Sequence, residues 1–509
     1  MKNKFFNFLI FSICLLTLSS CGIIDFIDSY NSFIHGDESY EGNDSSSFER
    51  GEIGDSINIL NEVFNGTTNK FDQNLRKDFS NIKSNDNFNN AERLNINQNI
   101  QSLEYFNGAL PSKGKVDCLV IPIDFPDYPA KTNFSLDSIK VNYQSVSSYY
   151  YNSSYGQLDL NFDILDWHRM SKKASYYEKY NEGKHAGDVP GVSAIIKEVF
   201  TSLDDEIDFS KYDSDKDGAI DSVYFIYSHP FNSINSNFWW AFQYFYFEQD
   251  LFDGVIPYYY IFASYDFIFQ NDKKVVSAET YIHETGHLFG LEDYYDYDTY
   301  NGYNKGGLGG ADMMDCNFGD HNPFSKLSLG WIDDPILVNK SGTISISPFE
   351  ENGDVIMICD NYDSSKGMFQ DYFLVTYFKY RSLLNLNSDF YSSNGIKIYR
   401  VHATLEKYNT DGQTFNYFKY DNSYTDFNLI DNIIASARTK STATNNGIYS
   451  NLIYDDMCAA TNDLFLSGYV ANNLCYYDYR FSNNNKYSSF EFTVDSLTDD
   501  KATLTFKKN

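Results

Sequence analysis

The chain has 509 residues, of which 42% are hydrophobic and 18% aromatic, and its formal net charge at pH 7 is −31. A chain of this length holds about two to four domains, and its apolar content excludes a wholly disordered protein. Because a strongly acidic surface repels phosphate and no Lys/Arg-rich run offsets it, we expect no nucleic-acid partner.

The N-terminus has the pattern of a bacterial lipoprotein export signal. Lys2 and Lys4 precede an apolar run over 5–18, which ends in small residues directly before Cys21. The run is too short for a transmembrane helix. We therefore expect a signal peptide over 1–20 and lipid on Cys21, which would attach the mature chain to the membrane at the bacterial cell surface. The alternative is an ordinary signal peptide that is cleaved nearby.

The remaining cysteines exclude a disulfide scaffold. Without Cys14 in the signal and Cys21 at the lipid site, five cysteines remain, an odd number spread widely along the chain. No Cys-x-x-Cys pair suggests a thiolate metal site. A bond between Cys458 and Cys475 stays open, because the sequence alone does not show pairing.

Three regions follow the signal. Residues 21–112 are rich in Asn, Asp, Ser and Gly and predict a mostly flexible tether or pro-segment. Over 113–335, strand and helix signals alternate, which predicts a mixed α/β domain. Residues 336–509 have short β-rich runs separated by turn residues, which predict an all-β, sandwich-like module. The predicted strands are 118–124, 158–167, 222–227, 343–346, 355–359, 372–378, 396–401, 490–494 and 502–506, and the predicted helices are 135–151 and 192–203.

One short motif in the middle region carries the chemistry. His283 and His287 are four residues apart, so on a helix both imidazoles project from one face and can bind a single zinc ion. Glu284 follows His283 directly, so its side chain is turned about 100° around the helix from that of His283 and can reach a metal-bound water. Gly290 can adopt the left-handed conformation that ends a helix. The chain would then return with Asp293 as the third ligand, or with Asp296 in its place.

These residue types suit hydrolysis. Zinc lowers the pKa of a bound water from about 15.7 to about 7 and polarises a carbonyl group. Glu284 would accept the proton of that water and deliver it to the leaving amine. With 8 histidines in 509 residues, this spacing is rare by chance. The motif therefore predicts a zinc hydrolase.

The motif resembles that of the immune inhibitor A-type secreted zinc metallopeptidases, His-Glu-x-x-His-x-x-Gly-x-x-Asp. The resemblance covers about 116–335 and continues weakly beyond it. It implies a zincin-like metallopeptidase domain that cleaves proteins or peptides, with Met314 in a methionine turn below the metal. Similar segments are 120–127, 147–156, 166–167, 312–315, 321–323, 329–331, 372–375 and 395–401.

The chain departs from this family in two places. Glu292 stands where the family commonly has proline, and the aromatic-rich stretch 238–269 looks divergent. All the motif side chains are present, so these departures concern substrate preference rather than metal binding. Trp239 and Trp240 line either a hydrophobic substrate groove or the core. His321 follows the methionine turn and is a candidate for orienting substrate or a ligand.

A separate acidic loop predicts a calcium site. Asp213, Asp215, Asp217 and Asp221 occupy positions 1, 3, 5 and 9 around Gly218 at position 6. Alternating oxygen ligands with a glycine at the sharp turn fit calcium. Position 12 is not acidic and a strand follows, so the loop is not a complete EF-hand; a solvated acidic turn is the alternative.

Taken together, these features predict a lipid-anchored, extracytoplasmic zinc endopeptidase with structural calcium. Two other classes of function stay open. One is a surface-binding lipoprotein whose peptidase-like domain has little or narrow activity, against which the intact Glu284 argues. The other is a zinc hydrolase of non-peptide substrates or a peptidase of another zincin group. Cleavage specificity, oligomeric state and the ligand of the C-terminal module stay open as well.

Overall fold

A computed structural model describes residues 76–80, 91–96, 100, 109–130, 134–179, 190–231, 238–270, 275–276, 278–296, 307–380, 382, 384, 390–410, 413–425, 427–435, 459–471, 474 and 487–509. The predicted signal peptide and the predicted lipid site at Cys21 lie outside these residues. The described part is mixed α/β, with several sheets and few helices. None of its helices has the length and apolar character that a membrane crossing requires.

The N-terminal part is built on a six-stranded sheet in the order β3-β2-β5-β7-β6, with β4 also paired to β2. The pairs of β2 with β3, β4 and β5 are parallel, as is β5 with β7, whereas the edge strand β6 runs antiparallel to β7. Its strands are β2 (Gly114–Asp124), β3 (Leu158–Ile164), β4 (His168–Arg169), β5 (Val223–Tyr227), β6 (Phe242–Phe245) and β7 (Tyr259–Ser264).

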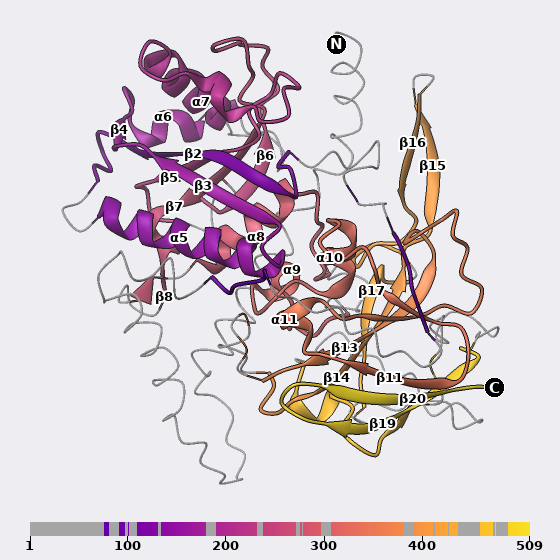
Figure 1. Cartoon of the computed structure of the whole chain (residues 1–509). Helices are drawn as coiled ribbons and strands as arrows, with labels where there is room; N and C mark the ends of the chain where they lie inside the picture. The colour runs from indigo at the N-terminus through magenta and orange to yellow at the C-terminus, as the bar shows by residue number, and fades with distance from the viewer. Residues whose placement is uncertain are drawn as a thin grey trace, which may run out of the picture.

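Helices cover both faces of this sheet, as Figure 1 shows. α5 (Leu136–Ser153) and α8 (Glu279–Leu288) lie on one face, and α6 (Ala174–Lys179) and α7 (Pro190–Leu203) on the other. In α7, apolar residues recur three and four apart and are buried against the sheet, which is why this segment is helical. Short elements nearby are η2 (Phe209–Tyr212), η3 (Tyr265–Ile268), β8 (Phe269–Gln270), β9 (Val275–Val276), α9 (Met313–Cys316) and α10 (Pro323–Ser328).

The C-terminal part contains two larger sheets and a hairpin of β15 with β16. The first sheet has the order β1-β10-β12-β13-β14-β17 and the second the order β11-β20-β19-β18, and their apolar residues share one hydrophobic cluster. The elements are β1 (Glu92–Arg93), β10 (Ile336–Val338), β11 (Gly342–Ile346), α11 (Phe349–Asn352), β12 (Ile356–Ile358), β13 (Asp371–Phe378), β14 (Gly395–His402), β15 (Leu405–Thr410), β16 (Gln413–Phe418), β17 (Ile430–Ile433), η5 (Thr461–Asp463), β18 (Val470–Ala471), β19 (Phe490–Leu497) and β20 (Ala502–Lys508).

The helices and strands predicted from periodicity are confirmed, with ends that differ by up to four residues. The largest shift extends β2 to Gly114, and the next largest shorten β3 to Ile164 and extend β19 to Leu497, all at strand ends. A buried parallel strand and an amphipathic helix leave strong patterns in the sequence, because burial repeats along them with a fixed period. Element ends depend on local caps and turns, so they are less well predicted.

Part of the segment predicted as a tether or pro-segment packs against the folded body. β1 pairs antiparallel with β10, and Ile96 is buried in the largest hydrophobic cluster. The backbone N–H of Leu110 donates to the carbonyl of Leu288 at 3.0 Å, at the end of α8. Arg76 forms an ion pair with Asp159 at 2.8 Å. At these residues the chain is tied down by burial and hydrogen bonds.

Candidate metal centre

Helix α8 carries the three motif side chains, and the turn after it brings the chain back. His283 and Glu284 are buried, and His287 is half-buried. Beyond the helix, Gly290 has φ +85°, the left-handed conformation expected of it. The backbone N–H of Leu291 donates to the carbonyl of Gly286 at 3.2 Å, which reverses the chain direction. This reversal returns Asp293 to the face of α8 that bears the histidines.

Three side-chain atoms converge at this point. The distance from His283 Nε2 to His287 Nε2 is 3.2 Å. The Oδ1 atom of Asp293 lies 2.8 Å from His283 Nε2 and 3.3 Å from His287 Nε2. Ligands about 2.0–2.1 Å from a tetrahedral zinc ion are about 3.3 Å apart, so the triangle has suitable dimensions. In the described part of the chain, this convergent group contains neither Asp296 nor Glu284.

Backbone carbonyls fix the protonation of both imidazoles. His283 Nδ1 lies 2.9 Å from the Met313 carbonyl oxygen, and His287 Nδ1 lies 2.8 Å from that of Leu291. Because a carbonyl oxygen only accepts hydrogen bonds, each Nδ1 carries the hydrogen and donates it. In the neutral rings, both Nε2 lone pairs then face each other and the Asp293 carboxylate. Three acceptors at this spacing favour a cation between them, and the donor set fits zinc.

The charges in the group reinforce one another. Burial by itself disfavours the protonated form of His287, but the Asp293 carboxylate, with Glu284 and the Leu291 carbonyl, outweighs it and raises the pKa of His287 to about 9. Burial likewise opposes ionisation of Asp293, yet the two histidines hold its pKa well below the usual range. The group therefore favours a carboxylate next to a positive charge, whether that charge is a proton or a metal ion.

Glu284 lies between α8 and the edge strand β6. Its side chain is buried, and burial raises its pKa, while the nearby backbone N–H of Gln243 in β6 acts in the opposite direction and lowers it. The raised pKa suits a group that accepts and returns a proton near neutral pH. Gln243 was not among the predicted residues, because its contribution is a backbone N–H that leaves no mark in the sequence.

Residues 312–315, which are predicted to form a methionine turn, support both α8 and the returning chain. Met314 is fully buried, and a Cβ atom on Gly286 of α8 would lie 2.4 Å from its Sδ. The Met314 carbonyl accepts a hydrogen bond from the Tyr294 N–H at 2.8 Å, next to Asp293. Asp312 caps α9, since its Oδ1 accepts from the Met314 N–H at 2.9 Å. The turn therefore contacts both α8, which carries the two histidines, and the residue that directly follows Asp293.

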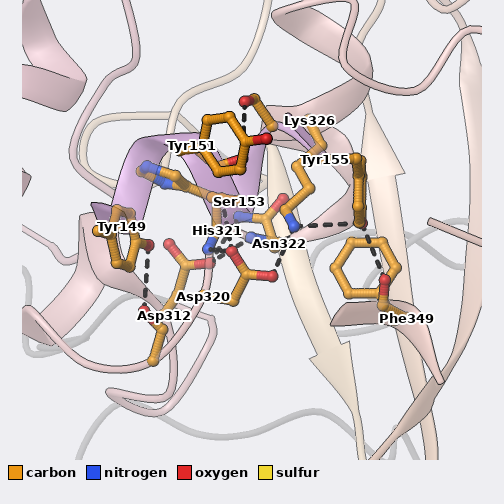
Figure 2. Close-up of polar contacts among 12 residues, drawn as sticks. Tyr149, Tyr151, Ser153, Tyr155, Asp312, Asp320, His321, Asn322, Lys326 and Phe349 are labelled. Carbon is orange, nitrogen blue, oxygen red and sulfur yellow. Dashed lines mark hydrogen bonds and ion pairs between the residues drawn. The ribbon is translucent and has the colours of Figure 1, made fainter. Parts of the chain in front are cut away.

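A buried polar network lies behind the turn, as Figure 2 shows. The Lys326 Nζ donates to Asp320 Oδ2 at 2.5 Å and to the Tyr155 hydroxyl at 3.1 Å. Asp320 Oδ1 accepts from the Ser153 hydroxyl at 2.6 Å and from the His321 N–H at 2.9 Å. The network ties the end of α5 to α10.

His321 itself belongs to the interior. Its ring packs against those of Tyr149, Tyr150 and Trp331, with centroids 5.6, 5.8 and 6.0 Å away, and it is 1% exposed. Burial lowers its pKa well below the usual value and keeps the ring neutral. A substrate-orienting role does not suit a ring with so little exposed surface.

The predicted calcium loop brings three of its four carboxylates together. Side-chain oxygens of Asp213, Asp215 and Asp221 lie within 4.8 Å of one another, and the group does not contain Asp217. Gly218 has φ +93°, as a sharp turn requires. The Asp217 carboxylate accepts from the Ala219 N–H at 2.8 Å. Calcium binding here stays a prediction.

The divergent aromatic stretch divides between core and surface. Trp239 is 1% exposed and stacks on His229 with centroids 4.1 Å apart, so it belongs to the core. Trp240 is half-buried and contacts Phe231 and Phe267, with centroids 5.6 and 5.3 Å away.

No protein-family model and no curated protein matches this chain.

Proposed function

We propose that the protein is a zinc endopeptidase with a zincin-like domain over about 113–335, similar to the immune inhibitor A-type metallopeptidases. The observation that carries the proposal is the convergence of the His283, His287 and Asp293 acceptor atoms beside the buried Glu284. The two Nδ1–H groups donate to carbonyls, so in the neutral rings both Nε2 lone pairs point toward the Asp293 carboxylate and are available to a metal ion.

Each residue has a distinct role in peptide hydrolysis. His283, His287 and Asp293 would hold the zinc ion, which when bound would supply a Lewis acid and an activated water. Glu284 accepts the proton of the attacking water and delivers it to the leaving amine. The low exposure of Glu284 and its raised pKa support this role. A group that acts first as a base and then as an acid works best when its pKa lies near the ambient pH.

The edge strand β6 supports a peptide as the substrate. β7 pairs with one side of β6, and the backbone N–H of Gln243 in β6 lies near the Glu284 carboxyl group. An extended peptide can add to a sheet edge through its backbone groups. A peptide bound along β6 would therefore run past the base. A protein or peptide substrate is part of the proposal for this reason.

The remaining parts of the proposal rest mainly on the sequence. The export pattern before Cys21 supports a lipid anchor and a position outside the bacterial cytoplasm. The acidic loop supports a structural calcium ion held by Asp213, Asp215 and Asp221. The net charge of −31 argues against a nucleic-acid partner.

The test uses soluble protein that begins at Gly22, incubated with a diverse peptide mixture whose new termini are read by mass spectrometry. We expect cleavage that stops on chelation and returns with zinc. Glu284→Gln should lower the rate by about 10²- to 10⁴-fold without loss of bound zinc, because it removes only the base. Glu279→Gln in the same helix is the matched control.

Two results would contradict the proposal. Cleavage that survives Glu284→Gln would assign the activity to another site. Bound zinc without any peptide cleavage would favour the alternatives, a surface-binding lipoprotein or a zinc hydrolase of other substrates.

A further inference from the structure

The chain segment that follows Asp293 is held by the C-terminal part of the molecule. The Asn422 side-chain Nδ2 donates to the Tyr294 carbonyl at 3.0 Å. The Ser423 hydroxyl donates to the Tyr295 carbonyl at 3.2 Å. Each pair is 128 residues apart in sequence. The connection between β16 and β17 therefore reaches the loop that carries the proposed third zinc ligand.

Hydrogen bonds hold the Asn422 side chain in one orientation. It is 4% exposed, and its second Nδ2 hydrogen bond goes to the Ile430 carbonyl at 3.0 Å. Its Oδ1 accepts from the Ile430 N–H at 3.1 Å. Both amide hydrogens and the amide oxygen are thus used, and a rotation of the side chain would break all three bonds. Because Ile430 begins β17, the amide is anchored on the C-terminal sheet.

The contact from Asn422 completes the fixation of Tyr294. The Tyr294 N–H already donates to the Met314 carbonyl at 2.8 Å, and its hydroxyl lies 2.8 Å from the Ser325 hydroxyl. With Asn422 on the carbonyl, both peptide groups of Tyr294 and its ring are held. Asp293 is the preceding residue, so these contacts fix its backbone. Mutation of residues that orient metal ligands typically weakens metal binding by about 10- to 100-fold.

We infer that Asn422 is a positioning residue and that the C-terminal part completes the metal centre by holding the loop of Asp293. The inference rests on the proposed zinc site. It makes the β-rich part a component of the catalytic unit rather than an appended module, since its loss would release the Tyr294 carbonyl. The largest hydrophobic cluster joins the two parts in the same way, because residues such as Tyr150 and Val401 both belong to it.

The experiment compares Asn422→Ala with Asn432→Ala in the full soluble protein. Asn432 is a matched control, because it is also 4% exposed and donates across the same interface, to the Leu308 carbonyl at 3.0 Å. Zinc dissociation constants are measured by competition with a chromophoric chelator. We expect Asn422→Ala to weaken zinc binding by about 10- to 100-fold, and Asn432→Ala to change it by less than about threefold. The visible spectrum of bound cobalt should change only in Asn422→Ala.

A second variant tests the inference in case Asn422→Ala does not fold. Asn422→Asp keeps the shape and the acceptor for the Ile430 N–H but removes both donors, so it should weaken zinc binding as Asn422→Ala does. Equal zinc affinity in wild type and either folded variant would overturn the inference while leaving the proposed function intact. Equal losses in Asn422→Ala and Asn432→Ala would also overturn it. A wild-type protein that binds no zinc would overturn both.

Discussion

Gly286 is the residue of α8 at which helix preference and packing make opposite demands. In a helix interior, alanine is about 1 kcal/mol more favourable than glycine. A Cβ atom on Gly286, however, would lie 2.4 Å from Met314 Sδ and 3.0 Å from its Cε. Met314 is fully buried, so its side chain can move only into space that other core atoms fill.

The net effect of Gly286→Ala follows from these two terms. Overpacking a core typically costs about 1–3 kcal/mol, which offsets the gain of about 1 kcal/mol from helix preference. We therefore expect Gly286→Ala to lower the free energy of unfolding by about 0–2 kcal/mol. Met314→Ala alone should cost about 2–5 kcal/mol, because it leaves a cavity. In the double variant the new methyl group has room, so Gly286→Ala becomes stabilising there.

Urea unfolding of the four proteins, followed by circular dichroism with chelator present, measures this double-mutant cycle. The coupling free energy between the two sites should be about 1–3 kcal/mol. A stabilising Gly286→Ala in the wild-type background, together with additive effects in the double variant, would refute the contact between the turn and the helix.

Two further predictions concern two buried charged residues, Lys326 and Glu350, which interact with Asp320. Lys326→Met should cost about 3–5 kcal/mol, because it leaves the Asp320 carboxylate buried without its cation, and urea unfolding should show the loss. Lys197→Met is the control, since its ion pair with Asp250 is exposed and should contribute at most about 1 kcal/mol; equal losses would contradict the reasoning. Glu350→Gln should stabilise the protein above pH 7. Burial raises the pKa of Glu350 to about 7 from 4.5, so the folded state binds its proton more tightly and wild-type stability falls as pH rises between those values. The gain, at most about 3 kcal/mol, should vanish below about pH 4.5, and a gain that does not vary with pH in urea unfolding would count against it.

The sequence by itself determined the elements and the first part of the site. The continuous apolar run of β2 and the spacing in α7 predicted a buried strand and an amphipathic helix, because burial repeats with the period of each structure. The four-residue separation of His283 and His287 predicted their common face for the same reason. Gly290 predicted the turn back, since glycine adopts a positive φ without steric cost.

Only the tertiary structure decided what surrounds these residues. The Gln243 N–H beside Glu284 and the Asn422 amide on the Tyr294 carbonyl come from strands and loops far away in sequence. The structure also placed Trp239 in the core and paired Glu92 and Arg93 with β10. Periodicity shows which face of an element is buried, but not which element buries it. Contacts to backbone groups add a further limit, because every residue type offers nearly the same N–H and carbonyl.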